Sequence, residues 1–325
     1  MRALVTGDRG FLGRHFRAEL EARGWDVHGC DNDDAGPEVT DCRNLFQYWD
    51  TAWMAPGAPH IDLVVHCAAV VGGRATIDGS PLETAVNLEL DAAMFRWAAR
   101  AKPGRVLYIS SSAAYPVENQ TESAARFRLH SIDPYGLRLS ESDLLAPYGS
   151  GHPSGTRPVH TPDQVYGWSK VMGEVLAARL REAGVPVTVV RPFSGYGHDQ
   201  SPDYPFRAFL DRAVRREDPF RLWCGDCTRD FIHVDDLVKG ALAVVESGTE
   251  RPVNLATGRG TSFLELAAMV CDAVGYAPEI IPDPAAPAGV AYRVGDPEWL
   301  HQIYVPAVDL ELGIRRSLDQ MGVAT

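Results

Sequence analysis

The chain has 325 residues, of which 45% are hydrophobic and 23% charged, a composition typical of a globular protein with one large domain and a smaller one attached. Its formal net charge is −12, which argues against nucleic-acid and membrane-surface partners because both require basic patches. The start, MRALVTGDRG, has no apolar signal region, and no later apolar run is long enough to span a bilayer. We therefore expect a soluble, cytoplasmic protein with no membrane or nucleic-acid partner.

Six cysteines stand at positions 30, 42, 67, 224, 227 and 271. Their spacing fits no disulfide framework, and in a chain of this size we expect them to be reduced. Cys224 and Cys227 have the spacing of a redox or metal-binding pair, but a single pair without a nearby histidine cluster is a weak signal. The simpler interpretation is a turn before a strand, and we expect no metal site.

The first half of the chain alternates short apolar runs with amphipathic stretches, a pattern typical of a parallel sheet covered by helices on both faces. The expected strands are Ala3–Thr6, Asp26–Cys30, Ile61–His66, Arg105–Ser110 and Val187–Arg191, and the expected helices are Phe11–Arg23, Leu82–Arg100 and Gly167–Ala183. These elements predict an α/β fold with a doubly wound parallel sheet of the Rossmann type.

Beyond Pro192 the alternation stops, and loops, short helices and proline-rich stretches such as Ile281–Gly289 follow. We expect residues 1–191 to form the main domain and residues 192–325 to form mainly a smaller, C-terminal domain that binds the substrate. Strand and helix patterns return within residues 228–256, so this segment is predicted to rejoin the main domain.

A glycine pattern follows the first expected strand directly. Gly7, Gly10 and Gly13 lead from the strand into a helix, which lets backbone N–H groups and the helix N-terminus face a pyrophosphate. Asp31 ends the second strand, where a carboxylate accepts from the ribose 2′-OH and repels a 2′-phosphate. The cofactor is therefore predicted to be NAD, although Arg9 and Arg14 are close enough in sequence to pair with the 2′-phosphate of NADP.

A phenol and an ammonium group are predicted to share one face of a helix. Tyr166 and Lys170 are four residues apart in the segment YGWSK at the start of an expected helix. A cation that close favours the phenolate, which is the form a general base for a sugar hydroxyl needs. The similar segment around Tyr135 has Leu139 four residues later and lacks the cation.

Serines follow the fourth expected strand in YISSSAAYP, at the end of a parallel sheet where ligands bind. With this segment the sequence resembles the extended short-chain dehydrogenase/reductases, specifically the NAD-dependent sugar-nucleotide epimerase and dehydratase family. The matching segments are TGDRGFLG at Thr6–Gly13, HCAA at His66–Ala69, SSSAAYP at Ser110–Pro116, YGWSK at Tyr166–Lys170, RPFSGYG at Arg191–Gly197 and RDFIHVDDL at Arg229–Leu237. The resemblance covers nearly the whole chain.

The resemblance assigns expected roles to individual residues. The catalytic residues it implies are Ser111, Tyr166 and Lys170. The cofactor-binding residues it implies are Gly7, Arg9, Gly10, Phe11, Leu12, Gly13, Asp31, Asn32, Asp41, Cys42, Cys67, Ala68, Ala69, Asn87, Ser110, Pro192 and Phe193, together with Tyr166 and Lys170. The substrate-binding residues it implies are Val71, Ser111, Ser112, Ser194, His198, Arg229 and Arg293, of which the two arginines are expected to hold the substrate diphosphate.

The same resemblance restricts the reaction. Dehydratases of the family need a pair of carboxylates after the catalytic hydroxyl, where this chain has Ser112 and Ala113. The branch that contains GDP-fucose synthase and GDP-mannose epimerase, which the segment Ala68–Gly73 resembles, uses a cysteine at the place of Ala113. His198 lies near the position of an acid in that branch, and a loop histidine is the simpler interpretation of it.

The leading hypothesis is therefore an NAD-dependent epimerase of a nucleotide-diphosphate sugar, which oxidises C4 to a transient keto sugar and reduces it from the other face. The alternatives are a reductase or dehydrogenase of an NDP-4-keto sugar, or a 3,5-epimerase-like enzyme. A non-enzymatic cofactor-sensing module is disfavoured because Ser111, Tyr166 and Lys170 are all present.

Two features concern partners and substrate choice. The stretch from Tyr115 to Tyr166 is longer than is usual in the family, and we expect the excess within Val117–Pro162 to cover the sugar pocket or to form an oligomer contact. The helices Leu82–Arg100 and Gly167–Ala183 resemble those that pair in dimeric relatives, so a homodimer is expected. The expected ligand partner is an NDP-sugar.

Overall fold

A computed structural model describes residues 1–31, 46, 60–73, 77, 79–121, 138–144, 161–283 and 289–323. The main sheet has six parallel strands in the order β2-β1-β3-β4-β5-β9. Their bounds are β1 Arg2–Thr6, β2 Asp26–Cys30, β3 Leu63–His66, β4 Val106–Ile109, β5 Val187–Pro192 and β9 Val253–Leu255. The order reverses at β1, because β2 lies on one side of it and β3 on the other, and such a switch point opens a crevice at the carboxyl ends of the strands.

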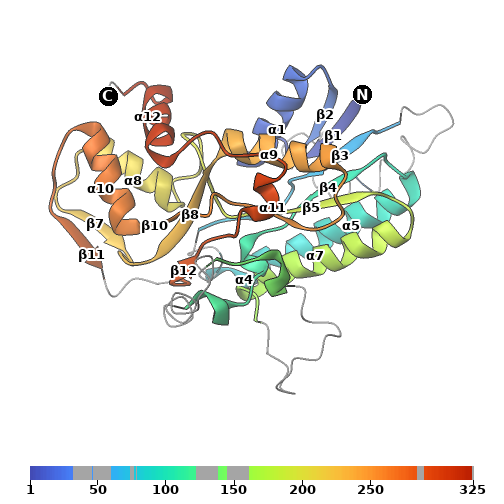
Figure 1. The fold of residues 1–325 in the computed structure, drawn as a ribbon, viewed down its shortest axis with the longest axis horizontal. Coiled ribbons are helices and arrows are strands. Elements are labelled where there is room, and N and C mark those ends of the chain that lie inside the picture. The colour runs from blue at the N-terminus through green and yellow to red at the C-terminus, as the bar shows by residue number, and fades with distance from the viewer. Residues whose placement is uncertain are drawn as a thin grey trace.

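Helices cover both faces of the main sheet (Figure 1). On one face lie α1 (Phe11–Ala22) and α9 (Val234–Ser247); on the other lie α4 (Pro81–Thr84), α5 (Val86–Ala101) and α7 (Gln164–Glu182). Adjacent strand residues point to opposite sides, so Val64 packs in the core under α5 and α7 while Val65 packs in the core under α1 and α9. This two-sided burial explains the continuous apolar runs in the sequence.

A smaller lobe follows the main sheet and lies at the other end of the molecule (Figure 1). Its strands form a sheet of β6 (Ser194–Tyr196), β8 (Thr228–His233), β10 (Gly260–Ser262) and β12 (Tyr292–Arg293), and a parallel pair of β7 (Phe220–Trp223) and β11 (Ile280–Asp283). Its helices are α8 (Pro205–Val214), α10 (Phe263–Val274) and α12 (Leu310–Gln320). These elements enclose a third hydrophobic core that includes Phe206, Leu266 and Ile314.

The remaining elements are short and lie near the junction of the two lobes. They are the 3₁₀ helices η2 (Ser112–Ala114), η3 (Val117–Gln120) and η4 (Glu141–Leu144), and the helix α11 (Glu298–His301), which contacts β9. Leu139 forms an isolated parallel bridge with Gly295, and this bridge joins the segment before η4 to the smaller lobe. Most of the expected insertion, residues 117–162, lies outside the described residues.

The predicted doubly wound parallel sheet with a smaller, mostly C-terminal lobe is confirmed. Two details differ from expectation: the long helix predicted over Leu82–Arg100 is divided at Ala85 into α4 and α5, and β8 belongs to the sheet of the smaller lobe. Within residues 228–256 only α9 and β9 return to the main sheet. None of the described helices is long and apolar enough to cross a membrane.

Helix α7 approaches the sheet closely at Gly173. Below it, the buried Asp91 accepts a hydrogen bond from Tyr108 Oη at 2.6 Å and lies 3.2 Å from His66 Nε2. A Cβ atom on Gly173 would lie 1.8 Å from Tyr108 Oη and 2.8 Å from Asp91 Oδ2. Glycine therefore allows the helix to pack directly on a buried polar network that has no room for a methyl group.

We expect Gly173→Ala to lower the free energy of unfolding by roughly 1–3 kcal/mol, because the added methyl group overpacks this contact. The measurement is urea unfolding followed by circular dichroism. Gly79→Ala is the matched control, since no described atom lies within 4 Å of its Cβ position. Equal stability of the two variants would contradict the proposed close approach.

Candidate active site

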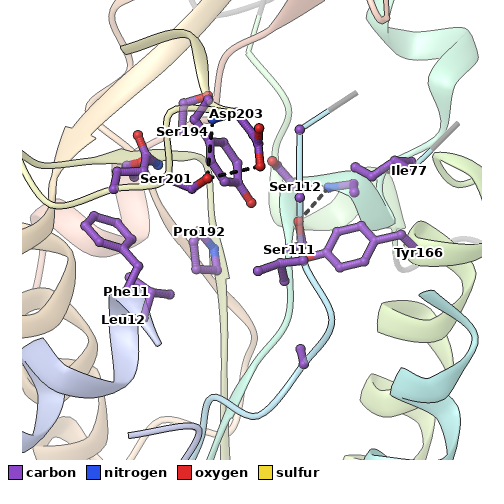
Figure 2. Close-up of a pocket in the computed structure, with 18 of the residues that line it drawn as sticks. Phe11, Leu12, Ile77, Ser111, Ser112, Tyr166, Pro192, Ser194, Ser201 and Asp203 are labelled. Carbon is purple, nitrogen blue, oxygen red and sulfur yellow. Dashed lines mark hydrogen bonds between the residues drawn. The ribbon is translucent and has the colours of Figure 1, made fainter. Parts of the chain in front are cut away.

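A pocket of about 950 Å³ opens at the carboxyl ends of β1, β3, β4 and β5 and extends to the smaller lobe. Figure 2 shows Phe11 and Leu12 on one side of it, Ser111 and Tyr166 on the other, and Pro192 between them. Residues Ser194, Ser201 and Asp203, which follow β5, line its end toward the smaller lobe. The pocket therefore brings together residues that are distant in the sequence.

The glycine turn forms one wall of this pocket. Gly7 has a φ of +67°, which favours glycine, and a Cβ atom on Gly13 would lie 1.9 Å from the Gly7 carbonyl oxygen. Gly10 is the N-cap of α1 and provides no side chain to satisfy the first N–H groups of the helix. The backbone can thus approach an anion at the positive end of the helix dipole, and this geometry fits the pyrophosphate of a dinucleotide.

Asp31 lines the pocket beside the glycine turn. Its Oδ2 accepts a hydrogen bond from the backbone N–H of Arg9 at 3.1 Å, so the carboxylate is held against the turn. This position suits a contact with the adenosine ribose. The other residues predicted around the adenosine, Asn32, Asp41 and Cys42, lie outside the described residues.

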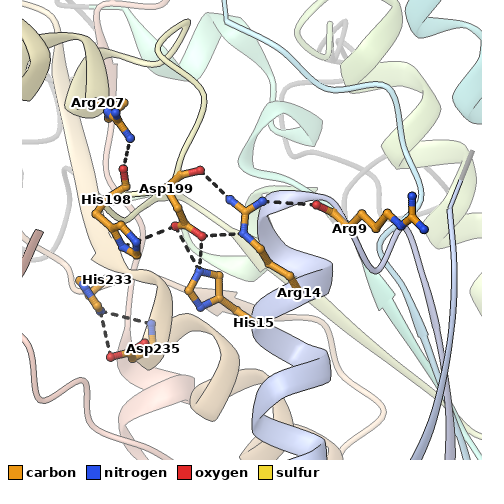
Figure 3. Close-up of polar contacts among 8 residues, drawn as sticks. All are labelled: Arg9, Arg14, His15, His198, Asp199, Arg207, His233 and Asp235. Atoms are coloured by element: carbon orange, nitrogen blue, oxygen red, sulfur yellow. Dashed lines mark hydrogen bonds and ion pairs between the residues drawn. The ribbon is translucent and has the colours of Figure 1, made fainter. Parts of the chain in front are cut away.

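Arg14 is engaged with the loop that follows β6. Its guanidinium donates to the Asp199 carboxylate and to the Asp199 carbonyl oxygen, and His15 Nε2 lies 3.1 Å from the same carboxylate (Figure 3). Burial opposes ionisation of Asp199, but the hydrogen bonds from His15 and Arg14 outweigh it and lower the pKa of this carboxyl. Arg14 thus ties the glycine turn to the smaller lobe, and a 2′-phosphate would have to compete with Asp199 for it.

The structure does not bring His198 to the pocket. Its Nδ1 lies 3.9 Å from Asp199 Oδ1, and its carbonyl oxygen accepts from Arg207 (Figure 3). The residue does not line the cavity, unlike its neighbours Asp199 and Gln200. The prediction that His198 contacts substrate therefore has no support in the geometry, and the loop histidine is the better interpretation.

The three predicted catalytic residues meet at the pocket wall. Tyr166 and Lys170 lie on the first turns of α7, with Lys170 Nζ 5.8 Å from the centre of the Tyr166 ring. The buried Lys170 ammonium donates to the Ile109 carbonyl oxygen at 3.1 Å, at the end of β4. Ser111 Oγ accepts from the backbone N–H of Ala113 at 3.1 Å, which leaves the hydroxyl hydrogen of Ser111 for a ligand.

Ser110, next to the predicted catalytic serine, is bound to a buried ion pair. Its Oγ donates to Glu174 Oε1 at 2.6 Å, and the same carboxylate accepts two hydrogen bonds from Arg191 at 2.8 and 2.7 Å. The Arg191 side chain is 1% exposed and also donates to Tyr115 Oη at 3.0 Å. Ser110 lines the pocket, and this network fixes it and the end of β4 against α7.

The segment after β3 forms another wall of the pocket. Cys67, Ala68, Ala69 and Val71 all line it. Burial raises the pKa of the Cys67 thiol to about 12, against the opposing charge of Lys170, so the thiol is neutral. Asn87 does not line the pocket; its side chain exchanges hydrogen bonds with the backbone of Val70 at 2.6 and 2.9 Å and so holds the segment in place.

Arg229 and Arg293 lie opposite each other on paired strands and both line the pocket. Next to Arg229, the buried Asp230 accepts from the backbone N–H groups of Thr257, Gly258 and Gly295 at 2.9–3.2 Å. Burial raises the pKa of Asp230 to about 6, although these donors favour its ionised form. Asp230 thus fixes the strand that carries Arg229 to the segment that carries Arg293.

The expectation that all six cysteines are reduced is wrong for one pair. Cys224 and Cys227 form a disulfide in the turn between β7 and β8, and both line the pocket. Cys67 and Cys271 are free thiols, and Cys42 lies outside the described residues. The turn before a strand was predicted, whereas the bond was not, because residue spacing alone does not report how two thiols are oriented.

Sequence reasoning missed several pocket residues after β6. Ser201, Asp203 and Tyr204 line the cavity, and Ser201 Oγ donates to Asp203 Oδ2 at 3.1 Å. Asp203 also approaches the other wall, since a Cβ atom on Gly73 would lie 2.3 Å from its carbonyl oxygen. No periodic pattern marks this loop, and the turn signal in SPDYP was the only available indication.

A glycine turn at the switch point of a parallel sheet, with a Tyr-Lys pair facing it, defines a dinucleotide-dependent enzyme of the short-chain dehydrogenase/reductase type. The chain belongs to the NAD-dependent epimerase/dehydratase family, whose model matches residues 3–146 and 145–256. The prediction of the family is confirmed, and with it the prediction of NAD as the cofactor.

Individual relatives span most of the chain. A dTDP-4-dehydro-6-deoxy-D-allose reductase of Streptomyces bikiniensis is 30% identical over 90% of this chain and 87% of its own length. An uncharacterised UDP-glucose epimerase of Bacillus subtilis is 25% identical over 85% of this chain and 83% of its own. The crystal structure of UDP-glucose 4-epimerase with UDP-glucose from Thermotoga maritima has a TM-score of 0.77 and 22% identity, with 99% of each chain covered. At 22% identity, the similarity to the Thermotoga maritima structure shows a shared fold alone.

We expect Asp31→Asn to raise the affinity for NADP relative to NAD about tenfold, about 1.4 kcal/mol, because the change removes the charge that repels a 2′-phosphate. Calorimetric titration with each dinucleotide measures the ratio. Asp26→Asn, at the far end of β2, is the control and should leave the ratio unchanged. An unaltered ratio in Asp31→Asn would place the adenosine ribose elsewhere.

Proposed function

We propose that the protein transfers hydride at C4 of a nucleotide-diphosphate sugar, and that it does so as a reductase of a 4-keto sugar. The observation that carries the chemistry is the arrangement of Ser111, Tyr166 and Lys170 across the pocket from the glycine turn. The direction of the reaction is supported by the 30% identity with dTDP-4-dehydro-6-deoxy-D-allose reductases over 90% of this chain.

When bound, NAD supplies the hydride acceptor and its reduced form the hydride donor. In the reductive direction Tyr166 gives its phenolic proton to the keto oxygen as the carbon receives hydride, and an alcohol results. The Lys170 ammonium, held by the Ile109 carbonyl, stabilises the phenolate left behind. Ser111 is free to donate its hydroxyl hydrogen to the same sugar oxygen. Both Arg229 and Arg293 line the pocket, and we propose that they hold the diphosphate of the substrate.

The second candidate is the 4-epimerase that the sequence analysis placed first. The same three residues would take a hydride from C4, and return of the hydride to the other face would invert the carbon. The likeness to the Bacillus subtilis protein named as a UDP-glucose epimerase supports it. A 3,5-epimerase-like reaction has less support, because Ala113 has no acid–base group and His198 does not line the pocket.

The two candidates differ in their need for reductant. A reductase consumes stoichiometric NADH with a TDP-, UDP-, GDP- or CDP-linked 4-keto-6-deoxy sugar and releases the cofactor. An epimerase purifies with bound NAD and interconverts C4 epimers of an NDP-hexose without added NADH. Following NADH absorbance and product sugars over this panel distinguishes them, and turnover of neither substrate class would overturn the proposal.

We expect Tyr166→Phe to lower kcat about 100- to 10,000-fold, since it removes the group that moves the proton, with little change in NAD affinity. Tyr276→Phe is the control, because this partly buried ring packs against the core of the smaller lobe and does not line the pocket. Steady-state kinetics of the reaction identified above provides the measurement. A Tyr166→Phe enzyme within a few-fold of the parent would refute the mechanism.

We infer that two copies of the chain pair through α5 and α7. Large apolar side chains are exposed on the outer surface of these helices: Trp168 is 52% exposed, Met172 47% and Leu88 40%. Trp168 and Met172 are four residues apart and so share one face of α7. Pairing of this face would remove an apolar patch from water.

Met172→Glu should therefore convert a dimer into a monomer, because a carboxylate would be buried without a partner. Size-exclusion chromatography with light scattering gives the mass. Leu264→Glu on α10, where the side chain is 40% exposed, is the matched control and should leave the mass unchanged. A monomeric parent protein would refute the pairing.

A further inference from the structure

The disulfide between Cys224 and Cys227 lies in the wall of the pocket, on the side of the smaller lobe. The proposed mechanism gives this bond no role. The two residues are three positions apart in the turn between β7 and β8, and the backbone N–H of Cys227 donates to the Cys224 carbonyl oxygen at 2.9 Å. The covalent bond and the hydrogen bond thus close the same short turn.

The backbone of this turn has a conformation that needs support. Cys224 has a φ of +46°, in the left-handed region that residues with a Cβ atom rarely adopt. Such a conformation persists only where surrounding contacts enforce it. The disulfide is one of those contacts, so opening it frees the backbone at Cys224 to leave this region.

The turn also holds the beginning of α10 and leads into β8. The backbone N–H groups of Phe263 and Leu264 donate to the carbonyl oxygens of Cys227 and Gly225, each at 3.0 Å. Phe263 lines the pocket, and the guanidinium carbon of Arg229 on β8 lies 5.3 Å from the centre of its ring. A change in the turn therefore reaches the pocket wall through both α10 and β8.

One of the two sulfurs is open to attack. Cys224 is partly exposed, whereas Cys227 is only 2% exposed, and exposed disulfides are the ones that tend to be labile and regulatory. A thiolate from an external dithiol would attack Cys224 Sγ, break the S–S bond and release Cys227 as a thiolate, which takes up a proton. The second thiol of the reagent then attacks the mixed disulfide and releases Cys224 as a thiol. The dithiol supplies both electrons and both protons and itself becomes a disulfide.

We propose that Cys224 and Cys227 form a redox switch in the pocket wall, and that exchange with an external dithiol lowers the affinity for nucleoside diphosphate. The identity of that ligand rests on the proposed function. Reduction removes the link that fixes the turn, so the wall beside Phe263 must be ordered when the ligand binds, and this ordering costs affinity. The glycine turn, Tyr166 and Lys170 belong to the main lobe, so NAD affinity and kcat at saturating substrate should not change.

The test is calorimetric titration of the parent protein with TDP, with UDP and with NAD, before and after treatment with dithiothreitol. Reduction should weaken the affinity for TDP or UDP about tenfold and leave the affinity for NAD within about twofold. Oxidised glutathione should restore the first value. Alkylation with iodoacetamide in denaturant, followed by peptide mapping, should find Cys224 and Cys227 blocked before reduction and alkylated after it.

Two variants connect the effect to this pair. Cys224→Ser/Cys227→Ser should have the affinity of the reduced parent protein, with and without dithiothreitol. Cys271→Ala is the matched control, because it removes a cysteine from the core of the smaller lobe that does not line the pocket. This control should respond to dithiothreitol as the parent does. The decisive comparison is made on the parent protein, so it does not depend on the folding of the double variant.

The switch is overturned if oxidised glutathione leaves the pair reduced, if the affinities of the two states are equal, or if the double variant still responds to dithiothreitol. Turnover of an NDP-sugar together with an affinity that ignores the redox state contradicts the switch alone. Redox-dependent binding of nucleoside diphosphate without turnover of any NDP-sugar contradicts the proposed function alone. A parent protein that binds no nucleoside diphosphate in either state contradicts both.

Discussion

The close approach of α7 to the end of β4 is the constraint on which the site depends. Lys170 can reach the Ile109 carbonyl oxygen only because the helix lies directly on the sheet. Gly173 permits this contact over Tyr108 and Asp91, and Gly167 permits it over Ala113. Two residues without side chains, six positions apart, therefore determine where the phenol and the ammonium of the same helix are placed.

Paired charges then fix the surroundings of that contact. Glu174 on α7 binds Arg191 on β5 and Ser110 at the end of β4, and Asp199 binds Arg14 on the first turn of α1. Ion pairs that are buried or half-buried add little net folding stability, because removing the charges from water offsets their attraction. Their main effect here is to fix the positions of the side chains. Arg14, Arg229 and Arg293 line the pocket, so its local charge favours an anionic ligand although the chain as a whole is acidic.

The sequence was sufficient for the main sheet because its strands are short, fully buried apolar runs, such as LVVH in β3 and VLYI in β4, separated by helical patterns. The glycine turn and the Tyr-Lys spacing were likewise local signals. The division of the expected long helix at Ala85 was not predicted, and nothing in the structure explains it. The membership of β8 in the second sheet was missed because the sequence pattern of a strand does not identify the strand with which it pairs.

The site residues that were missed are those defined by contacts across the chain. Asp163 meets Arg293 although 130 positions separate them, and the local sequence around Asp163 is not distinctive. His198 looked suitable from its motif, yet the backbone turns it toward Asp199. In both cases the outcome depends on how the loops of the smaller lobe fold over the sheet, which hydrophobic patterning does not encode.

The path of the chain between the lobes has an architectural consequence. After β5 the chain builds β6, α8, β7 and β8 of the smaller lobe, returns for α9 and β9, and leaves again for β10 and α10. A fragment that ends at residue 191 would lack β9 and would expose the backbone edge of β5 to solvent and to other chains. Each lobe is therefore built from more than one segment of the chain. Neither lobe could be exchanged as an independent domain by recombination at a single point in the gene.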